Sequence, residues 1–158
     1  MTRIGITGHS DLTTATSDLV YRALTDLLVP FDDVTGVTCL ARGADQVFAR
    51  AVLDAGGTLE VVLPARDYRD AKVKPDNRAE FDALLGRAAA VKYAPFEVSN
   101  REAYMAASEI LVGGVDRLIA VWDGRPASGH GGTGDVVIHA RRENVPVDVV
   151  WPTGSARG

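Results

Sequence analysis

Cysteine is almost absent from this sequence, because Cys39 is the only one among 158 residues. A disulfide within one chain is therefore excluded, and this usage is typical of a reducing compartment. Long apolar runs are also missing, and no charged segment precedes an apolar one near the first residues. We therefore expect a cytoplasmic protein with no membrane segment.

An excess of positive charge is missing too, since 17 Lys and Arg stand against 21 Asp and Glu, which makes the net charge −4. Nonspecific nucleic-acid binding depends on clustered basic residues that release counterions. The balance argues against nucleic acid as a partner, but it is compatible with a local anion pocket.

Closely spaced metal ligands are lacking as well. His9, His130, His139 and Cys39 are far apart in the sequence and form no ligand pair of the usual spacing. The sequence therefore predicts no metal site. Spacing alone reveals no Ser-His-Asp arrangement either.

What the sequence does contain is a regular alternation of short β-branched runs and helix-like segments. Strands are expected over residues 3–7, 34–40, 59–63, 90–93, 117–122 and 145–151, with helical periodicity between them. Residues 65–78 are charged and are expected to form a loop or a one-turn excursion. The pattern predicts an α/β protein with a Rossmann-like, open, mainly parallel sheet of six strands and helices on both faces. Residues 1–152 are expected to form one domain, and residues 153–158 a flexible, frayed tail.

A glycine-rich segment, ASGHGGTGDVV, spans residues 127–137 and follows the fifth expected strand. Glycines leave backbone amides uncovered, and amides at the start of a helix attract anions. Gly131, Gly132, Thr133 and Gly134 are therefore candidate phosphate ligands. Asp135 either caps the helix or is a weak catalytic candidate. The alternative is a flexible surface connection.

A second loop, Gly8-His9-Ser10, follows the first strand. The spacing is not that of the dinucleotide fingerprint. Gly8 allows close approach of a ligand, and the Ser10 hydroxyl is a candidate phosphate donor. His9 is a candidate base, although a lone histidine in a loop is more often solvated or a capping residue.

A third loop, Arg42-Gly43-Ala44-Asp45, follows the second strand. Arg42 either binds phosphate or pairs with surface carboxylates. Asp45 is first of all expected to cap the next helix, and its second role is to accept a hydrogen bond from a ribose hydroxyl or to serve as a weak catalytic candidate. The carboxyl ends of parallel strands meet at one edge, so the three loops are expected to face one crevice.

Further candidates surround these loops. Ser99 to Glu102 fits a capping box with Ser99 as the cap. Asn100 and Tyr104 share one helix face and either line the pocket or, for Tyr104, pack on the sheet. Trp122 either stacks on a base or lies in the core.

The loop sequences together resemble the SLOG superfamily of Rossmann-like proteins. The similar segments are GITGHSD (5–11), LARGAD (40–45), DRLIAVWDG (116–124) and GGTGD (131–135). The superfamily includes the cytokinin-activating "lonely guy" phosphoribohydrolases, the DNA-processing protein of natural transformation, and molybdenum-cofactor carrier proteins. The resemblance implies a nucleotide ligand, AMP-like, and a homo-oligomer, commonly a dimer.

The sequence also departs from the hydrolase branch of that superfamily. The glutamate of the hydrolase pattern is replaced by Ile138, and its threonine by Asp135. We therefore expect a nucleotide-binding sensor, carrier or regulatory module with a phosphate loop and no further cofactor that the sequence identifies. The alternative is a nucleoside 5′-monophosphate phosphoribohydrolase in which Asp135, Asp45 or Asp123 replaces the glutamate.

Overall fold

The computed structural model describes residues 1–127 and 132–158. In these residues six strands form one parallel sheet with the order β4-β3-β2-β1-β5-β6. The strands are β1 (Thr2–Gly8), β2 (Val34–Thr38), β3 (Thr58–Leu63), β4 (Ala90–Tyr93), β5 (Arg117–Val121) and β6 (Val147–Val150). The predicted α/β class with a six-stranded parallel sheet is confirmed.

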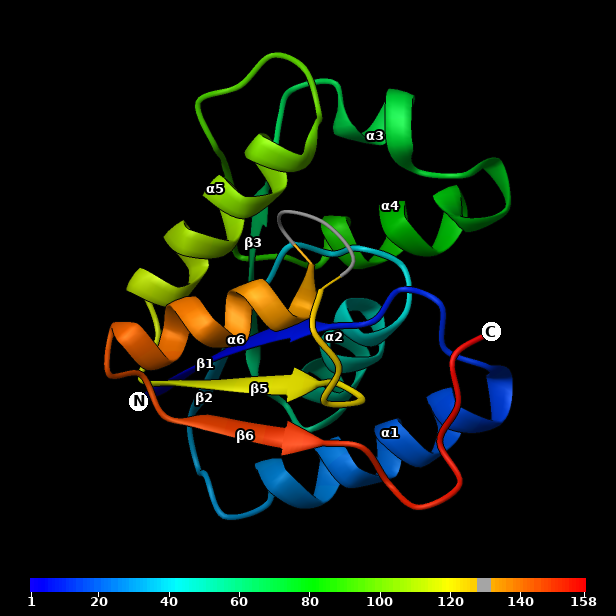
Figure 1. The fold of residues 1–158 in the computed structure, drawn as a ribbon, viewed down its shortest axis with the longest axis vertical. Coiled ribbons are helices and arrows are strands. Elements are labelled where there is room, and N and C mark those ends of the chain that lie inside the picture. The colour runs from blue at the N-terminus through cyan, green and yellow to red at the C-terminus, as the bar shows by residue number, and fades with distance from the viewer. Residues whose placement is uncertain (128–131) are drawn as a thin grey trace.

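Helices cover both faces of this sheet, as Figure 1 shows. The side chains of α1 (Thr14–Leu28), α2 (Ala44–Asp54) and α4 (Arg78–Gly86) pack on one face. Those of α5 (Arg101–Gly113) and α6 (Thr133–Arg142) pack on the other. The charged segment 65–78 is not plain loop, because it contains the short helix α3 (Tyr68–Lys72) and the 3₁₀ turn η1 (Pro75–Asn77).

The central strand β1 explains how close the two helix layers come. Ile4 and Ile6 are buried against α1 and α2, and each such side chain contributes about 1.5–3 kcal/mol. Gly5 lies between them in the sequence and faces the other layer. A Cβ at Gly5 would lie 2.5 Å from Cδ2 of Leu111, so glycine lets α5 approach the sheet closely.

The strand order reverses direction between β1 and β5. From β1 the chain passes through α1 to β2 on one side, and from β5 it passes through α6 to β6 on the other side. The loops after β1 and β5 therefore diverge toward opposite faces of the sheet. In open α/β sheets this divergence leaves a crevice at the carboxyl ends of the strands.

One predicted helix cap is wrong. The cap of α5 is Asn100, whose side chain accepts a hydrogen bond from the amide of Ala103 at 2.8 Å. The Ser99 hydroxyl donates to Asp67 at 2.7 Å instead, and the Ser99 amide donates to the same carboxylate oxygen. These two hydrogen bonds join the segment before α5 to the residue that precedes α3. Ser99 is buried, and its acceptor is a carboxylate distant in the sequence, so the local pattern does not reveal this role.

The C-terminal residues, predicted to fray, are instead held against the start of α1. The amide of Ala156 donates to the Thr16 hydroxyl at 2.8 Å, and Leu12 and Arg157 form an antiparallel bridge. Figure 1 shows this red segment running beside the blue start of α1. Among the described residues, no helix combines the length and the apolar character that crossing a membrane requires.

Candidate functional site

A cavity of about 690 Å³ opens at the carboxyl edge of the sheet. Its walls come from the segments after β1, β2, β3 and β5, from the first half of α5, from the first turn of α6, and from the C-terminal segment. It therefore lies at the reversal of strand order, and its volume is within the usual 300–1,000 Å³ of a small-molecule site.

The structure brings many of the predicted site residues to this cavity. Those that line it are Gly8, His9, Ser10, Arg42, Asp45, Tyr104, Gly132, Thr133 and Gly134. Gly43, Asn100, Trp122 and Asp135 are not part of its described lining. Gly131 and His130 lie outside the described residues. The predicted convergence of the three loops on one crevice is thus present in the geometry.

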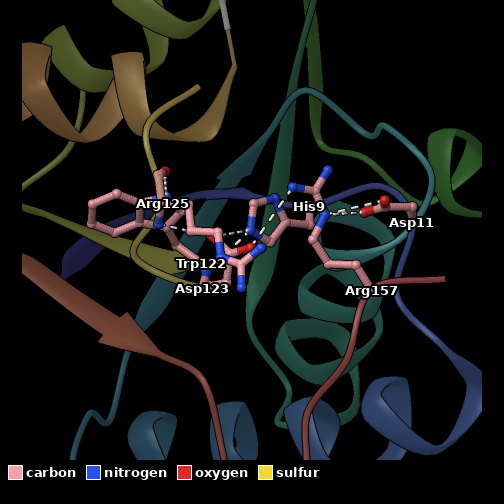
Figure 2. A network of polar contacts seen from close by, with 6 residues as sticks. All are labelled: His9, Asp11, Trp122, Asp123, Arg125 and Arg157. Atoms are coloured by element: carbon pink, nitrogen blue, oxygen red, sulfur yellow. Dashed lines mark hydrogen bonds and ion pairs between the residues drawn. The ribbon is translucent and has the colours of Figure 1, made fainter. Parts of the chain in front are cut away.

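His9 joins the loop after β1 to the loop after β5, as Figure 2 shows. Its side chain is 7% exposed, and Nε2 accepts a hydrogen bond from the Asp123 amide at 3.1 Å. Burial lowers the pKa of the imidazole and the Arg157 cation lowers it further, against the opposing charge of Asp123. The neutral ring is the form that accepts from an amide, so His9 positions the two loops.

Arg157 extends the same network to the C-terminal segment (Figure 2). Its Nε donates to both carboxylate oxygens of Asp11, at 2.8 and 3.1 Å. Its guanidinium also lies 3.8 Å from Asp123 Oδ2. Because Arg157 lines the cavity, the last residues of the chain supply part of its wall.

Two glycines at the site serve packing between loops. A Cβ on Gly8 would lie 2.5 Å from the Cβ of Ala44 and 2.8 Å from that of Val121. Gly43 has φ +87°, and a Cβ there would lie 2.6 Å from the His9 carbonyl oxygen. The loop after β1 therefore lies directly on the start of α2, and the Ala44 amide donates to the His9 carbonyl at 3.1 Å.

The loop after β2 is held in an unusual conformation. Leu40 is fully buried with φ +61°, in the left-handed region that a γ-branched side chain rarely adopts. Its amide donates to the Thr38 hydroxyl at 2.9 Å, and its carbonyl accepts from Gln46 Nε2 at 3.2 Å. Gln46 also exchanges two hydrogen bonds with Asn77 of η1. This network fixes the part of the cavity wall that precedes α2.

Arg42 follows the second of its two predicted alternatives, a surface ion pair. Its guanidinium forms a two-pronged contact with Asp76, at 3.3 and 2.9 Å. Both side chains are at least half exposed, so solvent screens the pair and a ligand can replace Asp76 at little cost.

Asp45 lies on the inner wall of the cavity, and the expectation that it caps α2 is wrong. The cap position is Gly43, and Asp45 is the second residue of the helix. It is 6% exposed, and its Oδ2 accepts from the Ala41 amide at 3.2 Å. Burial raises its pKa to about 7, although the Ala41 hydrogen bond opposes the shift. Asp45 is the sole carboxyl group in the described lining of the cavity.

The ionisable side chains that share this inner wall with Asp45 are weak acids, a thiol and two phenols. Cys39, Tyr68 and Tyr104 line the cavity beside it. Burial and the charge of Asp45 raise the pKa values of the Cys39 thiol and the Tyr68 phenol. The rings of Tyr68 and Tyr104 meet edge to face, with centroids 6.2 Å apart. This inner wall, consisting of Cys39, Asp45, Tyr68 and Tyr104, is called the floor below.

The start of α6 is packed closely against residues 125–127, which follow β5. A Cβ on Gly134 would lie 2.9 Å from the Ala127 amide nitrogen and 3.3 Å from the Arg125 carbonyl oxygen. The Trp122 indole donates to that same Arg125 carbonyl at 2.8 Å (Figure 2). Trp122 therefore shapes the turn after β5 and does not line the cavity.

Basic side chains dominate the rest of the lining. They are Arg42, Lys72, Lys74, Arg125 and Arg157. Within the described part of the chain, Lys72, Lys74 and Arg125 form no ion pair. Sequence reasoning named only Arg42 of these five. The lysines follow β3 as the other loops follow their strands, so the same strand-end rule applied to residues 65–78 identifies them.

Metal ligands do not gather at this site. Within residues 1–127 and 132–158, no group of three or more His, Cys, Asp or Glu side chains could hold a metal ion. The described lining thus offers basic side chains, the His9 imidazole, backbone amides, hydroxyl groups, the Cys39 thiol and one carboxyl group.

Comparison with known proteins identifies the fold. No protein-family model matches the chain, and no curated protein matches it in sequence. DNA processing protein A from Streptococcus pneumoniae superposes with a TM-score of 0.73 at 18% identity, over 98% of this chain and 52% of that protein. This chain thus spans about half the length of that protein.

Two further solved structures have the same fold. DNA processing protein A from Helicobacter pylori, described for its single-stranded DNA binding mode, has a TM-score of 0.69 at 14% identity, over 99% of this chain and 68% of that one. The molybdenum cofactor carrier protein from Chlamydomonas reinhardtii has a TM-score of 0.58 at 16% identity, over 94% and 75%. The chain therefore has the Rossmann-like fold of these proteins, as its alternating strands and helices predicted.

Proposed function

We propose that this chain binds a nucleotide or nucleotide derivative in the cavity at the carboxyl edge of the sheet, as a sensor, carrier or regulatory module. The phosphate groups of the ligand lie against the basic lining. A fold shared with a cofactor carrier and with DNA-processing proteins is compatible with such a ligand-binding domain.

The charge of the cavity carries this proposal. In its described lining, five basic side chains stand against a single carboxyl group, although the whole chain has a net charge of −4. Concentrating cations in a concave site of an acidic protein is unfavourable unless an anion is bound there, because like charges repel and lose hydration. Lys72, Lys74 and Arg125, which have no ion-pair partner in the described chain, are the first candidates for contact with phosphate.

The backbone supports the same assignment. Gly132, Thr133 and Gly134, at the start of α6, line the cavity beside the basic residues. Amides at a helix start bear partial positive charge and favour phosphate oxygens. Ser10 is exposed and also lines the cavity, and its hydroxyl adds a donor.

Thermal denaturation and calorimetry with AMP, ADP-ribose, NAD and cyclic AMP test the proposal. A ligand at 100 times its Kd adds about 2.7 kcal/mol of stability, which for a chain of this size raises Tm by about 5–10 °C. Adenosine, which has no phosphate, is the matched control and is expected to produce a much smaller shift. Absence of any shift or heat across the four nucleotides contradicts the proposal.

A second candidate function is cleavage of the N-glycosidic bond of a nucleoside 5′-monophosphate. The observation in its favour is Asp45, a carboxyl group inside the cavity whose pKa, about 7, suits proton transfer at neutral pH. Of the other replacements considered for the missing glutamate, neither Asp123 nor Asp135 is part of the described lining. Ile138, at the position of that glutamate, is 49% exposed and also not in the described lining.

In this second function, Asp45 takes a proton from water while the water oxygen bonds to C1′, and the base departs with the electron pair of the glycosidic bond. The departing base takes a proton from solvent water, and Asp45 then returns its own proton to solvent. Chromatographic detection of free adenine from AMP, lost in Asp45→Asn and retained in Asp26→Asn, supports it. If no common nucleoside monophosphate releases its base, the hydrolase function is excluded, and the binding proposal is unaffected.

Single-stranded DNA presents the same phosphate groups and is the natural competitor. The net charge of −4 opposes binding of a long polyanion outside the cavity. We therefore expect a mononucleotide to bind in preference to an oligothymidine of 20 nucleotides. A gel shift of the oligothymidine at micromolar protein concentration, together with no calorimetric heat from mononucleotides, would contradict this expectation and favour single-stranded DNA as the ligand.

A further inference from the structure

The cavity has two chemically different parts. The basic side chains come from the segments that follow β2, β3 and β5 and from the C-terminal segment, and Lys72 and Lys74 are exposed. These side chains, called the basic rim below, are Arg42, Lys72, Lys74, Arg125 and Arg157. The floor contains a carboxyl group, a thiol and two phenols, all of which become negative when they lose a proton. One ligand that satisfies both parts has an anionic group at one end and hydrogen-bond donors at the other.

Asp45 has unused hydrogen-bonding capacity on that floor. It is more than nine-tenths buried and lines the cavity. Its Oδ2 accepts one hydrogen bond, from the Ala41 amide, whereas Oδ1 accepts none from the residues that the structure describes. An ionised carboxylate has about four acceptor sites, and leaving them empty in a buried place costs free energy.

No cation in the described chain compensates this carboxylate. The neighbouring Arg42 side chain pairs with Asp76. The largest influence on the pKa of Asp45 is burial and not a nearby charge. The titratable groups that face it are Cys39 from the loop after β2, Tyr68 from α3 and, beyond Tyr68, Tyr104 from α5. None of these supplies a positive charge.

We propose that Asp45 accepts a hydrogen bond from a hydroxyl group of the ligand's sugar, and so makes the cavity selective for ribose over deoxyribose phosphates. This inference rests on the proposed function, because it assumes that the phosphate lies on the basic rim. It assigns the substrate class more narrowly: a phosphorylated ribose compound with a free 2′- or 3′-hydroxyl.

Calorimetry with AMP, 2′-deoxy-AMP and 3′-deoxy-AMP tests this selectivity without altering the protein. Loss of the hydroxyl that Asp45 contacts is expected to weaken binding roughly 10- to 100-fold, the range for a hydrogen bond to a charged group. The other deoxy compound is expected to bind within about threefold of AMP.

Asp45→Asn then identifies the acceptor. The amide keeps the size of the side chain and an oxygen for the Ala41 amide, but it removes the charge. The preference for the hydroxyl is expected to shrink to a few-fold in Asp45→Asn and to remain in the matched surface variant Asp26→Asn. Thermal denaturation of both variants verifies that they fold.

A pH series separates the carboxyl group from the phosphate of the ligand, which itself titrates near pH 6. The ratio of the affinities for AMP and its deoxy form cancels the phosphate contribution. That ratio is expected to rise as pH increases from 6 to 8, because only the ionised carboxylate accepts at both oxygens, and to stay flat in Asp45→Asn.

The outcomes are distinguishable. Equal affinities for AMP and both deoxy forms overturn the inference while leaving nucleotide binding in place. A preference for the hydroxyl that survives unchanged in Asp45→Asn assigns the contact to another residue and overturns it as well. If none of the three compounds binds, the inference falls, and if the wider panel also fails, the proposed function falls with it.

Discussion

Replacing Gly43 by alanine perturbs the contact on which the geometry of the cavity depends most. Gly43 has φ +87° and ψ −127°, a backbone conformation that side chains rarely adopt. The added Cβ would also lie 2.6 Å from the His9 carbonyl oxygen and 2.8 Å from both Cα and O of Ser10. These are backbone atoms, so the clash is relieved only by moving the loop after β1.

The two effects set the expected magnitude. Backbone strain at such a conformation costs about 1–3 kcal/mol, and forced overpacking typically adds about 1–3 kcal/mol. We therefore expect Gly43→Ala to lower the free energy of unfolding by about 4 kcal/mol, a large part of the 5–15 kcal/mol typical of a domain. For a chain of this length, the corresponding fall in Tm is about 8–16 °C.

Gly56 is the matched control. It has φ +80°, but a Cβ there would meet no atom within 4 Å. Gly56→Ala therefore isolates the backbone strain and is expected to cost about 1–2 kcal/mol. Gly86→Ala, at the end of α4 with open space around it, is expected to be neutral or slightly stabilising.

Urea denaturation of the three variants measures these differences, and calorimetry with the tightest nucleotide measures the effect on the cavity. The affinity of Gly43→Ala is expected to fall along with its stability, because Ser10 and His9 move together. If Gly43→Ala costs no more than Gly56→Ala, the contact between the loop after β1 and the start of α2 does not exist as described.

Three further changes test the electrostatics of the site. Replacing Lys72 and Lys74 together by alanine is expected to raise the Kd for AMP about tenfold, and by less at high salt. The control Lys92→Ala on β4 is expected to leave the Kd unchanged. Equal effects of the two changes would contradict the assignment of the basic rim. Asp45→Asn is expected to stabilise the unliganded protein at pH 8 but not at pH 4, as measured by urea denaturation. Folding raises the pKa of the Asp45 carboxyl group from 3.8 to about 7, so the protein with Asp45 loses stability as the pH rises between those two values, by up to about 4 kcal/mol. Arg157→Ala is expected to raise the pKa of His9 in an NMR titration, since the Arg157 cation helps to lower that pKa. The same change is expected to reduce Tm by about 1–4 °C, because the exposed ion pair with Asp11 is lost. The control Arg142→Ala on α6 is expected to change neither quantity.

Much of the fold was predictable because its strands and helices have strong local signals. The buried side chains of α1, Val20, Leu24 and Leu28, recur every fourth residue, and Pro30 follows the end of the helix. Local patterns were weaker where a partner is distant. Ser99 fits a helix cap in sequence, but Asp67 is 32 positions away and takes its hydroxyl.

The candidate site was predictable to the extent that parallel strands end at a common edge. That rule alone predicts that Gly8, Arg42 and Gly132 lie at one edge of the sheet, and all three line the cavity. It does not reveal which side chains remain available. Arg42 pairs with Asp76, which lies 34 positions along the chain, and Trp122 turns back to the Arg125 carbonyl.

The order of short strands, helices and glycine-bearing loops was enough by itself to determine the class of fold and the sheet edge at which the candidate site lies, because period, caps and turns are local properties of the chain. Only the tertiary structure decided the chemistry of that site. It buried Asp45 on the floor, brought Lys72 and Lys74 across from the loop after β3, and folded Arg157 back beside Asp11. Burial and the distance between charges depend on residues far apart in sequence, so a local pattern does not encode them.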